Sequence, residues 1–368
     1  MAVSEEDVLV ALRTVNDPDL QRDLVSLNMI RDLKIGDNGE VSLTVMLTTP
    51  ACPLKAQIES DVKAAVTRVA GVKKVLVNMG ANVTSTLRPQ DLATGVRNII
   101  GVASGKGGVG KSTVSVNLAI ALAQSGARVG LLDADIYGPN IPLMLGVTEE
   151  QPQLTVRTDA QGNEIEMMIP VEKHGLKIMS MGFLVGEDTP VIWRGPMLNS
   201  ALKQFLGQVD WGELDYLVVD LPPGTGDVQI SLIQLVKITG IVHVTTPQAV
   251  AVQDVRKGIM MFESQKVPLL GIVENMSYFI SPKSGERTDI FGTGGGENVA
   301  RIYGIPFLGQ IPLEPPIREG GDSGVPVVIG HPNSESVQRF RQIAEQLAAQ
   351  VSVQNFTQAE REPSPIRS

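Results

Sequence analysis

The chain has 368 residues, of which 43% are hydrophobic and 19% charged, a balance typical of soluble globular proteins with one large domain or two smaller ones. Its formal net charge of -9 argues against sequence-independent binding to nucleic acid, and no apolar run approaches the ~20 residues of a membrane-spanning helix. Residues 1–10 lack the basic start and apolar core of a signal peptide, and the one cysteine excludes an intrachain disulfide. We therefore expect a cytoplasmic protein without nucleic-acid or membrane partners.

Residues 1–83 have the pattern of a small α/β domain. Ser4, with Asp7 three residues later, resembles a capping box and predicts the start of a helix. The sequence Asp-Asn-Gly at 37–39 lies between two apolar runs, which predicts a β-hairpin. The remaining elements that we expect here are a helix over 53–70 and a closing strand over 73–79.

A second pattern begins at Asn98, where short apolar runs alternate with helical segments. Such near-continuous apolar runs predict a doubly wound, mostly parallel sheet that is covered by helices on both faces. The expected strands are 98–104, 127–135, 215–222, 240–247 and 269–276. We place this domain at 98–353, after a polar linker at 84–97 and before a disordered tail at 354–368.

Residues 105–112 match the phosphate-binding pattern G-x-x-x-x-G-K-[ST] between a predicted strand and a predicted helix. Glycines let successive N–H groups point at phosphate oxygens, and the positive end of the helix adds to the attraction. Lys111 is predicted to contact the β- and γ-phosphates, and the Ser112 hydroxyl to coordinate Mg²⁺. An ordinary glycine-rich turn is the alternative, which the surrounding strand and helix disfavour. The predicted nucleotide-binding residues are Gly105, Lys106, Gly107, Gly108, Val109, Gly110, Lys111, Ser112 and Thr113.

Two acidic loops follow predicted strands at the edge of the sheet where ligands bind in this fold class. Asp133 and Asp135 follow one strand, and Asp220 ends another. Asp220 has the position of an aspartate that orients Mg²⁺ through water, and the Gly224 N–H could then contact the γ-phosphate. For Asp133, a role in a cap or turn is an equally good interpretation.

The string GKGGVGKST at 105–113 resembles the variant P-loop of a class of dimeric ATPases that includes MinD, ParA and the nitrogenase iron protein. The resemblance implies a homodimer in which Lys106 reaches the phosphates of the ATP bound by the partner. A cation supplied in this way would neutralise charge that develops during phosphoryl transfer. The alternative for Lys106 is a solvent-facing lysine.

More specific strings resemble the Mrp/ApbC family of iron-sulfur carrier ATPases over 98–350. These strings are DADIYGPNIP, VIWRGPMLNSALKQF, DYLVVDLPPGTGDVQISLIQ, ENMSYF and DIFGTGGG. The N-terminal domain, with TTPACP at 48–53, resembles the MIP18-like domain of iron-sulfur assembly factors. The resemblance implies an ATP- and Mg²⁺-dependent ATPase with slow regulatory turnover. It would transfer clusters to recipient apoproteins and work with iron-sulfur assembly factors.

The same resemblance assigns roles to two residues beyond the P-loop. Asp135 would position or activate the water that attacks ATP, which adds it to Lys106 and Lys111 as an expected catalytic residue. Asn275 would donate or accept a hydrogen bond with the adenine base. A strand-end cap is the alternative for Asn275.

The chain departs from this family at the residues that hold the cluster. The family has a C-x-x-C pair after the ENMSYF segment, and two such pairs in a dimer bind a bridging [4Fe–4S] cluster. This sequence has Ser281 and Ser284 at that spacing. A serine hydroxyl stays protonated near neutral pH and is a poorer iron ligand than a thiolate. We therefore expect that this chain lacks the shared cluster site.

Cys52 is the remaining thiol, and it precedes Pro53, a favoured first residue of a helix. A thiol at or beside a helix N-cap has a lowered pKa, which suits transient contact with iron or a cluster. A small buried residue in a tight loop is the alternative.

Two other functions fit the ATPase class. One is a positioning ATPase like MinD or ParA, but the C-terminal residues form no amphipathic pattern and the acidic composition does not favour DNA binding. The other is a cluster-free scaffold that is switched by ATP. A reductase of the nitrogenase type is disfavoured because its cluster cysteines are missing too.

Overall fold

The computed structural model describes residues 3–36, 38–84, 92–136, 138–158, 162, 164–184, 195–281 and 283–361. The chain forms two compact units, one of Met1–Thr84 with Ala348–Ser368 and one of Ser85–Leu347. Residues 85–91 of the expected linker and residues 362–368 of the expected tail lie outside the described residues.

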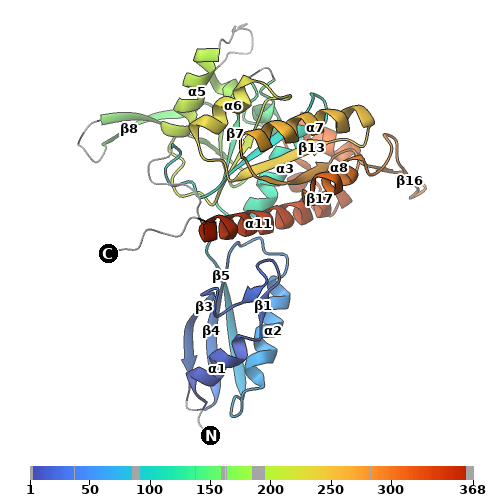
Figure 1. The fold of residues 1–368 in the computed structure, drawn as a ribbon. Coiled ribbons are helices and arrows are strands. Elements are labelled where there is room, and N and C mark those ends of the chain that lie inside the picture. Colours follow the sequence, from blue (N-terminus) through green and yellow to red (C-terminus); the bar gives the residue numbers. More distant parts are fainter. Residues whose placement is uncertain are drawn as a thin grey trace. The chain divides into compact units, whose positions relative to one another are not determined.

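The first unit contains a three-stranded sheet in the order β3-β4-β5, with β3 and β4 antiparallel and β4 and β5 parallel. Its elements are α1 (Glu5–Leu12), β1 (Asn16–Asp17), β2 (Arg22–Asp23), β3 (Ile30–Ile35), β4 (Glu40–Leu47), α2 (Lys55–Thr67) and β5 (Lys74–Ala81), drawn in blue in Figure 1. The expected helix start is present, because the Ser4 hydroxyl accepts a hydrogen bond from the Asp7 N–H at 3.1 Å. The expected hairpin is formed by β3 and β4.

The core of this unit lies between one face of the sheet and the two helices. Alternate residues of β4 are buried, namely Val41, Leu43, Val45 and Leu47. They belong to one cluster with Val8 and Leu12 of α1 and with Ile58 and Val62 of α2. The alternation of apolar and polar residues that predicted strands thus also selects the face that the helices cover.

The second unit is built on an eight-stranded sheet in the order β10-β11-β7-β12-β6-β13-β14-β17. All neighbouring strands are parallel except β10 and β11. The strands are β6 (Ile99–Ser104), β7 (Val129–Asp133), β10 (Val171–Lys173), β11 (Leu176–Ser180), β12 (Tyr216–Asp220), β13 (Gly240–Thr245), β14 (Leu269–Glu274) and β17 (Phe307–Gln310). The predicted α/β class with a mostly parallel sheet is confirmed.

All five residues of β12 are buried, which indicates that both faces of the sheet are covered. The helices of this part of the chain follow, with α11 belonging to the first unit from Ala348 on. They are α3 (Lys111–Gln124), α4 (Ile141–Leu145), η1 (Met181–Leu184), α5 (Gly195–Gly207), α6 (Asp227–Leu235), α7 (Ala249–Ser264), α8 (Gly295–Tyr303), α9 (Pro315–Ser323), α10 (Val327–Gly330) and α11 (Glu335–Arg361). Two hairpins complete the unit, β8 (Gln153–Thr158) with β9 (Glu164–Ile169), and β15 (Phe279–Ile280) with β16 (Arg287–Thr288).

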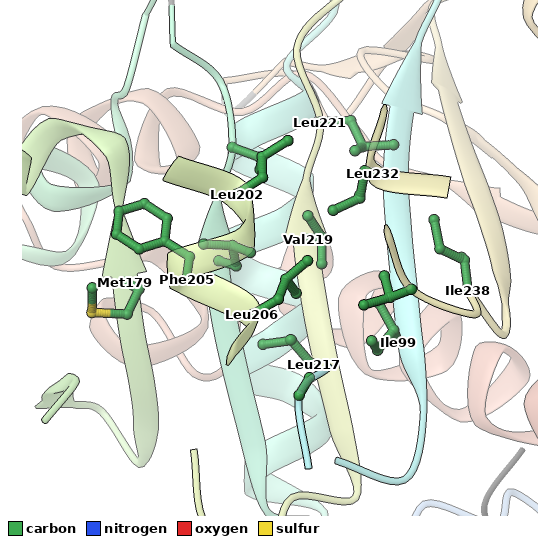
Figure 2. Close-up of a cluster of buried hydrophobic side chains, with 14 of the residues drawn as sticks. Ile99, Met179, Leu202, Phe205, Leu206, Leu217, Val219, Leu221, Leu232 and Ile238 are labelled. Carbon is green, nitrogen blue, oxygen red and sulfur yellow. The ribbon is translucent and has the colours of Figure 1, made fainter. Parts of the chain in front are cut away.

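Figure 2 shows the core on one face, where Leu202, Phe205 and Leu206 of α5 lie against Leu217 and Val219 of β12. Side chains alternate along a strand, so Asp220 points to the opposite face. On that face it is bonded by a serine of α3. The strands β6, β7 and β12 end at Ser104, Asp133 and Asp220, and all three strands contact α3.

The C-terminal helix is longer than the sequence analysis indicated. We expected a disordered tail from residue 354, but residues 354–361 continue α11. Residues 352–361 contain no glycine or proline that would end a helix. This part of α11 also has partners in the first unit, since Asn355 Nδ2 donates to the Thr84 carbonyl at 3.2 Å and the Arg22 guanidinium lies 5.4 Å from the centre of the Phe356 ring.

Among the helices within the described residues, none combines the length and the apolar character that crossing a bilayer requires.

Candidate nucleotide site

The P-loop connects the end of β6 to the start of α3, as its sequence pattern predicts. Gly105 passes so close to α7 that a Cβ atom there would lie 2.5 Å from the backbone carbonyl carbon of Asp254. Gly110 has a φ of +80°, a left-handed conformation that a residue with a side chain adopts at a cost. The two glycines of the motif thus have separate physical reasons, close approach at one end of the loop and backbone conformation at the other.

Lys111 is the first residue of α3, and its side chain is only 6% exposed. Its ammonium Nζ lies 2.8 Å from Asp220 Oδ2 and 3.4 Å from Asp135 Oδ2. The Ser112 hydroxyl donates to the same Asp220 oxygen at 2.6 Å. The fold therefore brings together the lysine, the hydroxyl and both aspartates that the sequence analysis selected from three separate segments.

Ser115 is a member of this group that the sequence analysis missed. Its hydroxyl donates to Asp220 Oδ1 at 2.6 Å, so both oxygens of this fully buried carboxylate are hydrogen-bonded. Ser115 lies one helical turn after Lys111, on the same face of α3. That spacing is the signal that could have identified it.

The hydrogen bonds of Asp133 are those of a residue that stabilises a turn, which was one of its two interpretations. Its Oδ2 accepts from the Ser180 hydroxyl at 2.8 Å and from the Ile141 N–H at 3.3 Å, and its Oδ1 accepts from the Asp135 N–H at 3.2 Å. Burial, and secondarily the negative charge of Asp220, raise the pKa of this carboxyl above its ordinary value. Asp133 therefore shapes the loop that presents Asp135.

The P-loop and the loop after β7 enclose a pocket with a volume of about 370 Å³. Its lining residues are Ser104, Lys106, Gly107, Gly108, Gly110, Lys111, Ser112, Thr113, Asp135, Gly138, Asn140, Met144 and Pro223. A Cβ atom built on Gly107 or Gly108 would meet nothing within 4 Å, so the backbone of the loop is open to a ligand. Exposed N–H groups, a lysine and a hydroxyl next to a carboxylate fit the phosphates and the Mg²⁺ ion of a nucleotide.

A second pocket, with a volume of about 350 Å³, adjoins the first, since Thr113, Asn140 and Met144 line both. The residues that line it alone include Leu143, Met276, Pro312, Leu313 and Ile317, so its wall is largely apolar. An apolar chamber beside a phosphate-binding loop fits the base and ribose of a nucleotide.

Asn275 lines this second pocket and also supports the P-loop. Its side-chain Nδ2 donates to the Val109 carbonyl at 2.9 Å, and its backbone N–H donates to the Thr245 carbonyl at 2.8 Å. The support of the P-loop was not expected from the sequence. Contact with adenine remains a prediction.

Gly224 and Lys106 lie at the edges of the site. The Gly224 N–H donates to the Ser104 carbonyl at 2.8 Å, so in this conformation it is used within the protein. Lys106 is partly exposed on the pocket wall, and its backbone carbonyl accepts from the Ser104 hydroxyl at 3.0 Å. The γ-phosphate contact of Gly224 and the cross-dimer contact of Lys106 remain predictions.

Ser281 and Ser284 lie together in the turn between β15 and β16. The Ser284 N–H donates to the Ser281 hydroxyl oxygen at 3.3 Å, and the Ser281 N–H donates to the Glu286 carbonyl at 3.0 Å. Within the described residues, no group of three or more histidine, cysteine, aspartate or glutamate side chains is arranged to hold a metal ion. The hairpin thus brings the two positions into one turn but supplies hydroxyls there.

Cys52 is partly exposed and lies in the loop before α2. We expected it at or beside the N-cap, but the N-cap is Leu54 and the helix begins at Lys55. The Lys55 N–H donates to the Cys52 carbonyl at 3.4 Å, so the residues around Pro53 form a turn ahead of the helix. The helix therefore has less influence on the thiol than the sequence suggested, because its field weakens beyond the first turn.

These features define a P-loop nucleotide-binding protein with a doubly wound sheet. Comparison with known proteins places it more narrowly: the chain belongs to the NUBPL iron-transfer P-loop NTPase family, whose model matches residues 95–348. A second model, described as an iron-sulfur cluster assembly protein, matches residues 5–77. The family resemblance inferred from sequence is confirmed.

Individual relatives agree with this assignment. An iron-sulfur cluster carrier protein from Synechocystis is 53% identical over 354 residues, which cover 95% of this chain and 99% of the relative. An iron-sulfur cluster transfer protein, NUBPL, from Dictyostelium discoideum is 49% identical over 261 residues and covers 71% of this chain and 79% of its own length. A solved nucleotide-binding protein from Archaeoglobus fulgidus in complex with ADP is 41% identical, with a TM-score of 0.53, covering 62% of this chain and 87% of that one.

Proposed function

We propose that this protein is an ATP-hydrolysing carrier that binds iron-sulfur clusters and transfers them to recipient apoproteins in the cytoplasm. The observation that carries the proposal is that Lys111 and Ser112, which line the pocket, both contact the buried carboxylate of Asp220. Membership of a family of iron-transfer NTPases, and relatives that are named cluster carriers, support the choice of cargo.

In this proposal each residue of the site has its own role in binding or hydrolysing ATP. Lys111 would leave its two carboxylate partners to bind the β- and γ-phosphates, and Ser112 with Asp220 would hold Mg²⁺. Asp135, which faces the Lys111 ammonium, would position the attacking water. Asn275 would hydrogen-bond adenine in the adjoining pocket while it supports the P-loop.

The carrier would work as a homodimer, with Lys106 of each protomer acting on the ATP of the other. Its partly exposed side chain on the pocket wall supports this role. Slow hydrolysis would then set the time that the dimer spends in each conformation. The domain limits 1–83, 84–97 and 98–353 remain a proposal from the sequence, and the structure differs from them at two places. Ala93 and Val96 belong to the core of the second unit, and the chain from Ala348 on belongs to the first unit.

The cluster is cargo, and the serines at 281 and 284 limit how tightly this chain can hold it. Two protomers would offer only Cys52 from each as thiolate, whereas a shared [4Fe–4S] cluster needs about four strong ligands. We propose that binding is weak, or transient through Cys52. A cluster-free scaffold switched by ATP is the second candidate function, and the serine pair is the observation that favours it.

Anaerobic reconstitution with iron and sulfide, followed by absorption and iron analysis, tests the proposal. The protein as it exists should acquire a weakly absorbing, easily lost cluster that Cys52→Ala removes. The double variant Ser281→Cys/Ser284→Cys should gain a stable cluster that strengthens the dimer, with nucleotide affinity unchanged. No iron uptake by the parent chain in the presence or absence of ATP would favour the scaffold. A full cluster that survives Cys52→Ala would instead show that non-cysteine ligands suffice.

A further inference from the structure

The loop that follows β12, residues 221–226, is fixed to the P-loop strand at two points. The Leu221 N–H donates to the Val102 carbonyl at 3.0 Å, and the Gly224 N–H donates to the Ser104 carbonyl at 2.8 Å. Ser104 is the last residue of β6, and its hydroxyl donates to the Lys106 carbonyl in the P-loop. The position of Gly224 is therefore coupled to the strand and loop that carry the phosphate site.

A side chain of α6 holds the same loop from the other side. Gln229 Nε2 donates to the Pro222 carbonyl and to the Gly224 carbonyl, each at 2.7 Å. Both partners are acceptors, so the amide must point its NH₂ group toward the loop. Gln229 is 1% exposed, and its Oε1 has no hydrogen-bond partner within the described part of the chain.

Four hydrogen bonds therefore hold residues 221–224, two from N–H groups of the loop and two from Gln229. A buried amide oxygen without a partner is unfavourable, so the contacts made by Nε2 must offset that cost. A Cβ atom on Gly224 would meet nothing within 4 Å, so no packed neighbour confines the loop at this residue. The loop is thus held by specific hydrogen bonds and not by packing around Gly224.

We propose that Gln229 is a positioning residue that holds the 221–226 loop in a conformation in which the Gly224 N–H is withheld from the nucleotide. Gly224 cannot donate to a γ-phosphate while it donates to Ser104. We call the hydrogen bond from Gly224 to Ser104, with the two hydrogen bonds of Gln229, the latch. A nucleotide with a γ-phosphate must break the bond from Gly224 to Ser104, whereas ADP has no phosphate that needs the Gly224 N–H. The inference rests on the proposed function, because it assumes that the pocket binds ATP.

The latch lowers the apparent affinity for ATP by the fraction of molecules in which it is closed. If it is closed in about nine-tenths of the molecules, removing it strengthens binding of a γ-phosphate nucleotide by up to about tenfold. Binding of ADP should change by less than about twofold, because ADP binds both conformations alike.

The experiment compares Gln229→Leu and Gln229→Glu with the parent chain. Leucine keeps most of the volume and cannot donate, and glutamate keeps the shape but faces two carbonyls with a carboxylate. Affinities for adenylyl imidodiphosphate and for ADP are measured with Mg²⁺ by calorimetry. Exchange of the Gly224 amide hydrogen is measured in protein without added nucleotide. Both variants should bind the triphosphate analogue more tightly relative to ADP, by up to about tenfold, with faster exchange at Gly224.

Gln234→Leu, on the exposed side of the same helix, is the control and should change neither ratio nor exchange. Equal weakening of both nucleotides in the Gln229 variants would mean a structural role and would overturn the latch. The latch is also overturned if the parent chain binds both nucleotides and the Gln229 variants have the same ratio of triphosphate to ADP affinity as the parent. A parent chain that binds neither nucleotide would refute the proposed function itself, and the withheld contact with it.

Discussion

At the scale of single residues, one ammonium group organises the candidate site. Lys111 lies between Asp220 and Asp135, and it is almost completely buried. The two acids come from different segments of the chain, and Asp220 has no exposed surface. The lysine that is expected to bind phosphate therefore also compensates buried negative charge in the fold.

Replacing Lys111 should consequently affect both activity and stability. Lys111→Ala is expected to abolish ATP hydrolysis, to weaken ATP binding strongly, and to lower the free energy of unfolding by about 3 kcal/mol, because it leaves a buried carboxylate without its cation. Steady-state ATPase assays, calorimetric binding and urea unfolding measure the three effects.

Lys106→Ala is the matched variant in the same loop. It should leave ATP binding and unfolding nearly unchanged and lower turnover by about 100-fold or more, since its expected contact is with the partner's phosphates. If both lysine variants lose binding affinity equally, the contact across the dimer is ruled out.

At the scale of elements, the packing of β13 against α7 buries a histidine. His243 lies in the middle of β13 and is 1% exposed. It contacts α7 where the helix has Gly258, since a Cβ atom there would lie 2.4 Å from His243 Nε2. Burial lowers the pKa of His243 to about 4, and its Nδ1 has no hydrogen-bond partner within the described residues. Strand and helix can approach closely only with a neutral imidazole between them.

This packing predicts a pH dependence of stability. The unfolded chain binds a proton at His243 below its ordinary pKa of about 6.5, and the folded chain does so only near pH 4, so stability falls as pH decreases through that window. The contribution reaches about 3 kcal/mol at the acid end. Urea unfolding of His243→Leu and of the parent between pH 7 and pH 4 should show a shallower loss in the variant. Replacing the exposed His331 is the control, and parallel pH profiles for His243→Leu and the parent would contradict the prediction.

At the scale of the whole molecule, the chain returns to its first unit at its end. Ala348–Ser368 belongs to the same compact unit as Met1–Thr84. Within that unit, Arg22 forms an ion pair with Glu360 at 3.1 Å and lies over the Phe356 ring. The ion pair is largely exposed, whereas Phe356 is partly buried, so the aromatic contact should contribute more.

Phe356→Ala is therefore expected to lower the stability of the first unit by about 1–2 kcal/mol, through lost apolar burial and the lost contact with Arg22. Calorimetry should show the unfolding of this unit shifted to lower temperature and the other transition unchanged. Glu360→Ala should change the free energy of unfolding of either unit by no more than about 0.5 kcal/mol. A shift confined to the other transition would mean that α11 beyond Ala348 does not stabilise the first unit.

Several features of the protein follow from sequence alone because their determinants are adjacent in the chain. The P-loop glycines, Lys111 and Ser112 lie within one short segment. The strands β6, β12 and β13 are predicted by their runs of apolar residues. The sequence also shows that serines at 281 and 284 depart from a family pattern. Local spacing was sufficient in each case.

Other features depend on which strands become neighbours. Ser115 bonds Asp220 across 105 positions, and Asn275 bonds Val109 across 166 positions. Periodicity cannot pair such residues, because the pairing follows from a sheet order that places β6 between β12 and β13. The tertiary structure alone therefore decided how Asp133 is used, what supports the P-loop, and that Gln229 holds the loop beside it.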